Sequence, residues 1–462
     1  MSVDLPVGWA SVEIIEVSAI NPKLPFDTID DDLEVSFLPM KNVEEVSNYI
    51  HLDEIRKYAN VKKGYTPMIN GDVIFAKITP CMENGKIAVV HSLKNGIALG
   101  STEFHVFRCN GASLNKFLFY FLVQERTRQI AAQNMTGAVG QRRVPKQFLQ
   151  SYSIPLPPLP EQHRIVAKIE ELFSSLDKGI ESLKTAQQQL KVYRQAVLKW
   201  AFEGKLTNVD VKEGELPEGW KWVKSNELFK FVTSGSRGWA KYYADSGAIF
   251  IRITNLNFDT LDIDLRPEKI QYVNPPQNSE GIRTKVQEGD FLFSITGYLG
   301  MFAIASKLDN AFVNQHVCLC RPKEGFNKKF VGYWIISKSG AHYHLNKNQK
   351  GAVKAGLTLD DLKSFPVPLA PLEEQTRIVA EIESRLSVCD KIEESISQSL
   401  QQAEALRQSI LKKAFEGKLV PQDPTDEPAS VLLERIRSGR EQQKPVVKKG
   451  KVKKGSAQLE LL

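Results

Sequence analysis

The chain has 462 residues, and its 61 Lys and Arg against 54 Asp and Glu give a formal net charge of +7. Its 42% hydrophobic and 25% charged residues are typical of a folded globular protein and exclude a wholly disordered chain. No apolar run approaches the roughly 20 residues that cross a membrane, and no secretory leader is visible after Met1. The five cysteines form no disulfide framework and predict reduced thiols in a cytoplasmic protein.

The chain starts with a motif that recurs near its middle. Leu-Pro-Val-Gly-Trp at residues 5–9 returns as Leu-Pro-Glu-Gly-Trp at residues 216–220. After each copy, short aromatic and β-branched runs separated by Gly, Pro and Asn predict a strand-rich mixed globule. We place the globules at residues 1–157 and 207–368. Gly71–Phe75 parallels Gly289–Phe293 as a turn leading into an apolar strand, but the globules otherwise share only a coarse pattern.

A long helical block follows each globule. Residues 158–206 align without a gap on residues 371–419, with 27 identical positions of 49. Apolar residues at gaps of three and four predict a coiled-coil seam in each block. Each block follows a Pro-rich segment and ends at a glycine that suits a helix C-cap, Gly204 or Gly417. We therefore expect two long helices, at 158–206 and 369–420, that pair in an antiparallel coiled coil. The predicted seam includes Tyr193, Trp200, Ile392 and Leu406.

Residues 421–462 are expected to form a C-terminal tail. A short helix is predicted around Ser430–Arg440. The segment from Lys444 to Lys454 carries six lysines and no acid, which predicts a disordered, solvated end. Without these six charges the rest of the chain is close to neutral, so the net charge alone is no sign of nucleic-acid binding.

Motifs that would indicate catalysis or metal binding are missing from the sequence. It contains no G-x-x-x-x-G-K-[ST] phosphate loop, no H-E-x-x-H pair and no Cys/His cluster. Asn274-Pro275-Pro276 begins like the loop of adenine methyltransferases, but Gln277 cannot stack on a flipped base as the aromatic residue of that loop does. We therefore assign no catalytic residues and no metal ligands.

Three polar stretches on predicted loops are candidates for contact with DNA. Basic, amide and small residues suit contacts to phosphates and base edges; Glu103 suits cytosine and Gln315 suits adenine. A solvated loop or a packed turn is the alternative interpretation of each stretch. The candidates are Gln141, Arg142, Arg143 and Lys146, with Lys347, Gln349, Lys350 and Lys354 at the same place in the second half; Ser236, Arg237, Trp239, Lys241, Arg252 and Asn255; and Thr102, Glu103 and Gln315.

Together these features resemble the specificity subunit of type I restriction-modification enzymes. The resemblance rests on the two Leu-Pro-x-Gly-Trp starts, the paired Pro-Leu-x-Glu-Gln-x-Arg-Ile-Val-Ala helix starts, the two Ala-Phe-Glu-Gly-Lys-Leu helix ends and residues 422–436. It implies an α+β fold, in which two mixed α/β target recognition domains are separated by two long helices. These helices would form an antiparallel coiled coil, and the whole chain would be an internal pseudo-twofold repeat.

The resemblance also implies a function. The subunit would recognise an asymmetric, bipartite sequence in double-stranded DNA, with one half-site per domain and the spacer set by the coiled coil. Two modification subunits would methylate adenine at N6 with S-adenosylmethionine, and two restriction subunits would cleave unmodified DNA with ATP and Mg²⁺. This subunit would bind no cofactor, catalyse nothing itself and contact no membrane. Partner-subunit contacts are expected at Glu161, Gln162, Arg164, Glu374, Gln375 and Arg377.

Two alternatives remain open at this point. A stand-alone methyltransferase or a fused restriction enzyme would need a catalytic domain that we do not find in the sequence. A structural coiled-coil adaptor would use its globules to bind protein instead of DNA. Salt-dependent binding to duplex DNA would separate the adaptor from a DNA-reading subunit, because phosphate contacts impose a steep salt dependence.

Overall fold

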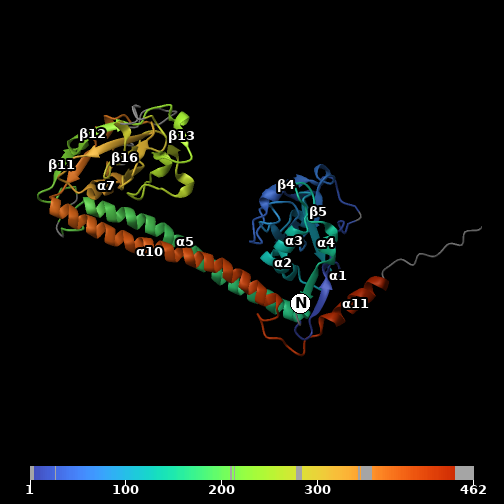
Figure 1. The fold of residues 1–462 in the computed structure, drawn as a ribbon. Helices are drawn as coiled ribbons and strands as arrows, with labels where there is room; N and C mark the ends of the chain where they lie inside the picture. Colours follow the sequence, from blue (N-terminus) through green and yellow to red (C-terminus); the bar gives the residue numbers. More distant parts are fainter. Residues whose placement is uncertain are drawn as a thin grey trace, which may run out of the picture. The chain divides into compact units, whose positions relative to one another are not determined.

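The computed structural model describes residues 5–26, 28–208, 211–212, 214–276, 283–341, 344 and 356–442. The chain divides into two compact units, and each holds one globule with parts of two long helices (Figure 1). Unit 1 comprises residues 1–181 and 400–462, and unit 2 comprises residues 182–399. The division therefore falls inside the long helices, whereas the segments predicted from the sequence meet at the helix ends. Within the described part of the chain, no helix has both the length and the apolar character needed to cross a membrane.

Three sheets build the globule of unit 1. One sheet has the strand order β2-β9-β6-β7 and is antiparallel throughout. Another has the order β4-β3-β8-β5, in which β3 and β8 are parallel. The third pairs β1 with β10 and so joins the start of the globule to its end. The strands are β1 Ala10–Glu13, β2 Ser18–Ile20, β3 Glu34–Leu38, β4 Glu54–Lys57, β5 Thr66–Ile69, β6 Val73–Ala76, β7 Ile87–Val89, β8 Ile97–Gly100, β9 Phe104–Cys109 and β10 Ser153–Leu156, and the helices are α1 Ile14–Val17, α2 Asn115–Val123, α3 Glu125–Gln133 and α4 Lys146–Ser151.

The globule of unit 2 repeats this plan. Its antiparallel sheet has the order β12-β19-β16-β17, its mixed sheet has the order β13-β15-β14-β18 with β14 and β18 parallel, and β11 pairs with β20. The strands are β11 Lys221–Lys224, β12 Phe229–Ser234, β13 Tyr243–Ala244, β14 Ala248–Ile251, β15 Tyr272–Val273, β16 Phe291–Ser294, β17 Phe302–Ile304, β18 Ala311–Val313, β19 Val317–Pro322 and β20 Pro366–Leu369, and the helices are α6 Ser225–Leu228, α7 Lys328–Ile336 and α9 Asp361–Ser364.

The Gly-Asp turn predicted in each globule is present and leads into a fully buried strand, β6 or β16. Its aspartate is fixed by an arginine on the neighbouring strand. Arg108 donates from Nε and Nη2 to the carboxylate of Asp72 at 2.8 and 2.7 Å. Arg321 holds Asp290 in the same way, at 2.8 Å for both bonds. Because such charge-assisted pairs are directional, they lock the turn to the sheet in both globules.

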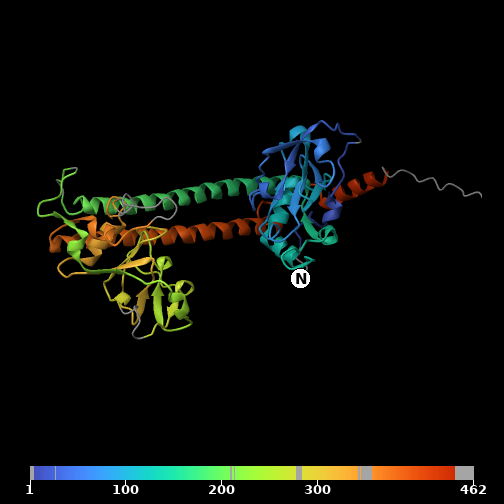
Figure 2. The same ribbon diagram turned by 90° about the horizontal axis from the view of Figure 1, so that it is seen from above.

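The two long helices are antiparallel, as predicted. Helices α5 (Leu159–Phe202) and α10 (Leu372–Phe415) each have 44 residues. In unit 1, Ile165 near the start of α5 shares a core with Ile410 near the end of α10. In unit 2, Val197 near the end of α5 shares a core with Ile378 near the start of α10. Figure 2 shows the two helices side by side.

Two equivalent ion pairs join the helices. In unit 2, Arg194 of α5 pairs with Asp390 of α10 at 2.6 Å. In unit 1, Arg407 of α10 pairs with Asp177 of α5. The offset of 213 residues relates each arginine to the other and each aspartate to the other, so the sequence repeat is also a repeat of contacts.

The predicted coiled-coil seam is wrong at four positions. Tyr193 and Trp200 on α5, and Ile392 and Leu406 on α10, are 40–51% exposed. Near the end of α5, Val197 of the predicted seam is buried, and Leu198 and Ala201, which the prediction left out, are buried in the same core of unit 2. The end of α5 therefore contributes to a core that holds residues of both the globule and α10, which a strict heptad pattern does not anticipate.

Each long helix ends in the glycine cap that the sequence predicts. Gly204 and Gly417 have positive φ angles of 74° and 69°, a conformation that glycine adopts without strain. The N–H groups of Gly204 and Lys205 donate to the carbonyls of Ala201 and Trp200, at 3.2 and 2.9 Å. These two bonds define a Schellman cap, so the Glu-Gly-Lys sequences are helix ends.

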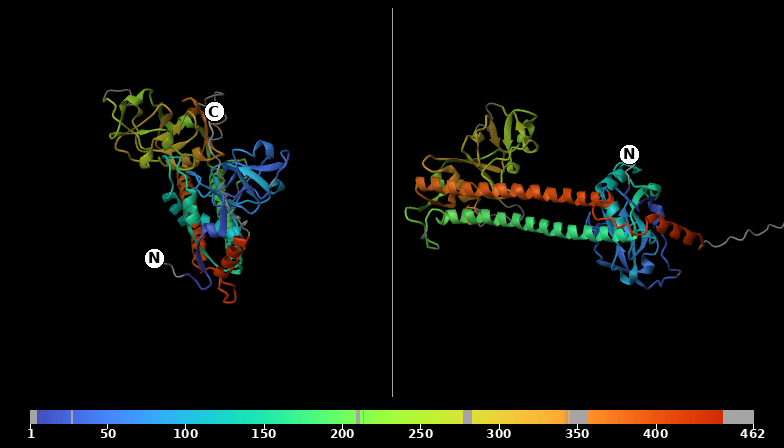
Figure 3. Two further views of the ribbon diagram at one scale, coloured as in Figure 1. Left: turned by 90° about the vertical axis from the view of Figure 1, so that its right-hand side faces the viewer. Right: turned by 90° about the horizontal axis from the view of Figure 1, so that it is seen from below.

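The C-terminal segment returns to the N-terminal part of unit 1 (Figure 3). Helix α11 spans Ala429–Gln442, close to the predicted range of 430–440. The N–H of Ala429 donates to the carbonyl of Gly8 at 2.9 Å, Leu433 is buried in the unit 1 core, and Arg437 pairs with Glu16. The basic segment from Lys444 to Lys454 lies outside the described residues.

Candidate nucleic-acid interface

The Glu-Gln sequence at the start of α5 fastens that helix to the globule of unit 1. Trp9 Nε1 donates to Glu161 Oε2 at 3.1 Å. Gln162 accepts from the N–H of Leu114 at 2.9 Å and donates to the carbonyl of Ala112, also at 2.9 Å. Glu161 and Gln162 are buried, with 1% and 0% exposure. Buried polar groups require such partners, so these side chains have a structural role.

Unit 2 repeats the arrangement at the start of α10. Trp220 Nε1 donates to Glu374 Oε2 at 3.0 Å, and Gln375 accepts from the N–H of Asn327 at 2.8 Å. One difference is clear. Glu374 Oε1 also accepts from Thr207 and Asn208 at 2.8 Å each, whereas none of the described residues donates a hydrogen bond to Oε1 of Glu161. Burial correspondingly raises the pKa of Glu161, against the opposing effects of the Trp9 bond and nearby Arg164.

The six residues predicted to contact partner subunits therefore fall into two groups. Glu161, Gln162, Glu374 and Gln375 are buried inside their own units, because the helix starts need these hydrogen bonds. Arg164 is half-buried and pairs with Asp426 of the C-terminal segment at 2.7 Å, while Arg377 is exposed. Contact with a partner subunit stays a prediction, and Arg377 is the most accessible of the six.

In unit 1 the predicted DNA-contact loop forms a finger, which we define as residues 136–143. Thr136 and Arg143 exchange backbone hydrogen bonds of 3.0 and 2.8 Å at its base. Gly137 and Gly140 take positive φ angles of 117° and 80° to make the turn. The side chain of Val139 at the tip is fully exposed. Backbone hydrogen bonds to Lys77 and Thr79 hold the base of the finger. The glycine-containing loop is therefore fixed to the segment that follows strand β6.

The structure brings two of the predicted stretches together at this base. Arg143 donates from Nε and Nη2 to the carboxylate of Glu103, with its shortest bonds at 2.9 and 2.8 Å. The Arg143 hydrogen bond, supported by the charges of Lys77 and His105, lowers the pKa of Glu103. Gln141, Arg142 and Thr102 are exposed beside this pair, and Lys146, the first residue of α4, is half-buried.

Unit 2 has the same backbone frame with different side chains. The N–H of Lys77 donates to Glu103 O, and the N–H of Ile295 donates to His316 O. His316 therefore takes the place of Glu103. Its Nδ1 lies 2.7 Å from Thr296 Oγ1, and its Nε2 lies 2.9 Å from Gln315 Nε2. With Gln315 donating, His316 Nε2 accepts and Nδ1 carries the proton.

The finger's base also has a counterpart in unit 2, where it carries no arginine. Val144 N–H donates to Lys77 O at 2.9 Å, and Leu357 N–H donates to Ile295 O at 3.0 Å. Gly356 thus stands where unit 1 has Arg143. The two units therefore share the same backbone hydrogen bonds but carry different side chains at these positions, Glu103 and Arg143 in unit 1 against His316 and Gly356 in unit 2.

The stretch around Arg237 in unit 2 is partly a packed turn. Arg237 and Lys241 are exposed, and Ser236 accepts from Arg283 at 3.1 Å. Of the remaining candidates of this stretch, Trp239 and Asn255 are buried and Arg252 is half-buried. Trp239 is buried and stacks on Phe250 with ring centroids 5.0 Å apart. It is therefore a core residue and does not extend towards a DNA groove.

Asn255 and Arg252 also serve the fold. Asn255 is 1% exposed; its side chain accepts from the N–H of Arg252 at 2.8 Å and donates to the carbonyl of Asp264 at 2.9 Å. Arg252 donates to the carbonyl of Lys269 at 3.1 Å. These contacts close a loop between β14 and β15. Neither the Asn255 side chain nor that of Trp239 is available to a base in this conformation.

Some candidates cannot be placed, and two functional candidates were missed. Lys347, Gln349, Lys350, Lys354 and Gln277 lie outside the described residues. Thr296 contacts His316, which is 20 positions away, and Arg283 contacts Thr233 and Ser236, which are 50 and 47 positions away. No local sequence pattern signals contacts of that kind.

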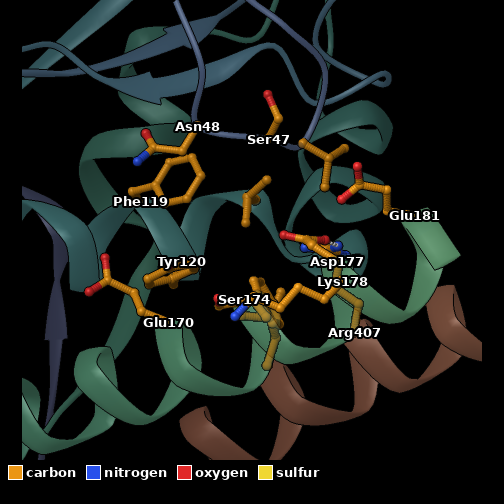
Figure 4. A pocket seen from close by; sticks show the side chains of 14 residues that line it. Ser47, Asn48, Phe119, Tyr120, Glu170, Ser174, Asp177, Lys178, Glu181 and Arg407 are labelled. Atoms are coloured by element: carbon orange, nitrogen blue, oxygen red, sulfur yellow. Dashed lines mark hydrogen bonds and ion pairs between the residues drawn. The ribbon is translucent and has the colours of Figure 1, made fainter.

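A cavity of about 450 Å³ lies in unit 1 between the loop around Asn48, helix α2 and the two long helices. Figure 4 shows its lining, which mixes aromatic side chains such as Tyr120 with charged residues of α5 and α10. Asp177 and Arg407 in this lining pair with each other, and Glu170 of the lining pairs with Lys116. Among the residues that the structure describes, no three His, Cys, Asp or Glu side chains gather as metal ligands would.

Comparison with known proteins gives one consistent match. A family model described as the type I restriction modification DNA specificity domain matches the chain twice, at residues 6–191 and 217–402. The chain is 26% identical to the EcoAI type I restriction enzyme specificity subunit of Escherichia coli over an alignment of 479 positions, gaps included, which covers 84% of this chain and 79% of that protein. It is 29% identical to the EcoBI specificity subunit of E. coli over 348 residues, covering 71% and 72%.

Solved structures share the fold. A chain from a study of complex assembly and conformational transition of the type I R-M system is similar with a TM-score of 0.73 and 24% identity, over 90% of this chain and 100% of that chain. The HsdS subunit from Thermoanaerobacter tengcongensis is similar with a TM-score of 0.57 and 24% identity, over 90% and 98%. The mixed α/β globules and paired long helices are thus an architecture already seen.

Proposed function

The chain belongs to the family of type I restriction-modification DNA specificity domains, and we propose that it is the subunit that reads the DNA target of a type I restriction-modification complex. Each unit would read one half-site of an asymmetric, bipartite sequence. The observation that carries this proposal is the duplicated frame: Lys77 and Glu103 in unit 1, and Ile295 and His316 in unit 2, make the same backbone bonds while the side chains around them differ. One scaffold with two sets of base-reading groups suits a target with two different words.

The surface of unit 1 supports DNA as the ligand. The finger carries Gln141, Arg142 and Arg143 on a glycine-rich turn, and the fully exposed Val139 lies at its tip. Arginine and glutamine form the hydrogen bonds that distinguish base edges, and an apolar tip can contact a thymine methyl group. Salt-dependent binding to duplex DNA would separate this role from that of a protein-binding adaptor, because phosphate contacts impose a steep salt dependence.

The long helices would set the spacing of the half-sites. A helix of 44 residues rises about 66 Å at 1.5 Å per residue. Half-sites one turn of DNA apart are separated by about 34–36 Å, which lies within that length. Ion pairs such as Arg194–Asp390 fix the register of the antiparallel helices.

Chemistry would be supplied by other subunits. We assign this chain no catalytic residue and no cofactor of its own. Two modification subunits would use S-adenosylmethionine to methylate adenine N6, and two restriction subunits would use ATP and Mg²⁺ to cleave unmodified DNA, all in the cytoplasm of a bacterial or archaeal cell. Arg377, exposed at the start of α10, is a candidate for contact with these subunits.

Sequencing of methylated adenines tests the proposal. We would express the chain with its modification subunits and map the methylated motif across a genome. We would then replace residues 10–150 with the matching region of another family member. The expected result is a bipartite motif in which the exchange alters one half and leaves the other half and the spacer unchanged. A change in both halves, or wild-type methylation with no bipartite motif, would contradict the proposal.

A further inference from the structure

We propose that Arg143 reads a guanine in the half-site of unit 1 and that Glu103 is a positioning residue for it. This inference rests on the proposed function and adds the base and the residues that read it. It reverses the sequence-based interpretation of Glu103, in which the carboxylate itself accepts a hydrogen bond from cytosine.

The Arg143 guanidinium donates hydrogen bonds from all three of its nitrogens. Nε and Nη2 donate to the two carboxylate oxygens of Glu103, and Nη1 donates to the carbonyl of Gln141 at 3.0 Å. The carboxylate thus occupies one side of the planar group. The Glu103 oxygens are engaged by the arginine, so they are poorly placed to accept from a cytosine. The opposite end of the guanidinium, formed by Nη1 and Nη2, still has N–H groups to donate.

The pair is fixed at both ends by the backbone. Glu103 lies in the turn that the bond from the N–H of Phe104 to the carbonyl of Ser101 closes, and its own carbonyl accepts from the N–H of Lys77 at 2.9 Å. Arg143 closes the base of the finger through its two bonds with Thr136, and it also bridges Ile78. A guanidinium held in plane by a carboxylate loses little side-chain entropy when it binds. Pre-organisation of this kind favours directional recognition.

The side chain of Arg143 remains partly exposed although Glu103 holds it. The Arg143 side chain is 43% exposed and that of Glu103 is 25% exposed. By contrast, the equally bidentate Arg108–Asp72 pair is 22% and 1% exposed, and it serves the fold. The Arg143 pair therefore has the hydrogen bonds of a structural pair but lies at the surface, at the base of the finger.

Guanine is the base that fits this geometry. Its O6 and N7 acceptors lie side by side in the major groove, and an arginine can reach both with two N–H groups. A phosphate contact needs no such orientation. Arg142 next to it is 45% exposed and approaches Glu83 only at 3.8 Å, so its side chain is free of a fixed plane and suits phosphate. Neighbouring arginines would thus have different roles.

The test uses the chain in complex with its modification subunits and a library of targets in which each base of both half-sites is varied singly. Discrimination is measured as the ratio of methylation rates at each position. Arg143→Ala should reduce discrimination at one G·C pair of one half-site by about tenfold to hundredfold, the range of a two-point base contact. Arg143→Lys keeps the charge but loses the two-point contact, so it should show the same loss at the same position.

Glu103→Gln separates positioning from direct reading. It should weaken discrimination at that same G·C pair, and the double variant Arg143→Ala/Glu103→Gln should be no worse than Arg143→Ala alone, because the two residues act as one unit. A general structural defect would lower methylation for all targets and would not be limited to one base position. If Glu103→Gln changed a different position, the carboxylate would be reading a base itself and the positioning role would be overturned.

Two further variants serve as controls. Arg142→Ala should weaken binding about equally for all library members, as loss of a phosphate contact does. Arg56→Ala removes an arginine of similar exposure that pairs with Glu54 on β4, and it should leave every position unchanged. Uniform loss with Arg143→Ala, or loss at a base other than guanine, would overturn the inference. A wild-type complex without any preferred sequence would instead refute the proposed function.

Discussion

Glu161 and Glu374 occupy the same position in the two repeats but have different surroundings, so the same substitution should have opposite effects. Both accept from a tryptophan, Trp9 or Trp220. Glu374 has two further donors on Oε1, whereas Oε1 of Glu161 is buried without a donor among the described residues. We consider Glu161→Gln and Glu374→Gln as a matched pair of single-atom changes.

The structure sets the expected magnitudes. In Glu374→Gln, the new amide nitrogen must face a group that was donating to the carboxylate, so at least one charge-assisted hydrogen bond is lost. Such bonds contribute roughly 1.5–3 kcal/mol, and we expect unit 2 to lose about 2 kcal/mol of unfolding free energy. Glu161→Gln can keep the bond from Trp9 and removes a buried charge with an unpaired oxygen. We expect unit 1 to gain between about 0 and 1 kcal/mol at pH 7.

The pH dependence provides an internal check. The pKa of Glu161 is raised in the folded state. The contribution of Glu161 to the stability of the folded state is therefore fully present below the ordinary carboxyl pKa, where the group is protonated. This contribution is lost as the pH rises through the pKa that Glu161 has in the folded state. The advantage of Glu161→Gln should thus be greatest at neutral pH and should shrink on acidification towards the ordinary value.

Native-state hydrogen exchange read by mass spectrometry would measure each unit separately, because it reports opening free energies of local segments. Peptides near 153–170 report on unit 1 and peptides near 366–383 report on unit 2. Equal destabilisation by the two substitutions, or a larger loss for Glu161→Gln, would refute the reasoning that the Oε1 partners decide the outcome.

Two further predictions concern the frame of the globules. Asp72→Ala leaves Arg108 without its partner in a buried pair and should cost about 3–5 kcal/mol, whereas Asp32→Ala removes an exposed ion pair and should cost less than about 1 kcal/mol in urea unfolding. Gly204→Ala combines a positive φ with a methyl group 2.2 Å from a proline carbon and should cost about 3 kcal/mol, whereas Gly64→Ala, with positive φ and open space, should cost about 1 kcal/mol in thermal unfolding.

Each comparison has a result that would contradict it. Similar losses of unfolding free energy for Asp72→Ala and Asp32→Ala would mean that burial of an ion pair does not increase its contribution to stability. A Gly204→Ala chain as stable as the Gly64→Ala chain would mean that the helix end and the following proline separate easily, and that the close approach does not constrain the chain.

The sequence predicts the elements whose signals are local or repeated. The long helices, their glycine caps at Gly204 and Gly417 and the Gly-Asp turns are all present, because periodicity and turn chemistry act over a few residues. The seam prediction is wrong at Trp200, where the neighbouring residues Leu198 and Ala201 of α5 are the ones buried against the globule of unit 2. Packing of that kind depends on the tertiary arrangement and not on the heptad.

The candidate site was harder to predict for the same reason. Glu103 and Arg143 are 40 residues apart, and nothing in either stretch shows that one holds the other. Trp239 beside Arg237 and Lys241 looks like a nucleic-acid contact, yet its ring fills a core. Glu161 and Gln162 stand out as a repeated motif, but repetition alone does not distinguish a surface used twice from an internal contact made twice.

The fastening of each globule to the helices has a consequence for inheritance. Phe415 at the end of α10 packs against Phe117 and Phe121 of α2, and Phe202 at the end of α5 packs against Phe330 and Trp334 of α7. Together with the Trp–Glu bonds, these contacts form one standard attachment, used twice. A gene segment exchanged between strains would encode a globule that can form these same contacts with the ends of the long helices. A new target could then arise in a single recombination event, with no compensating change in the helices.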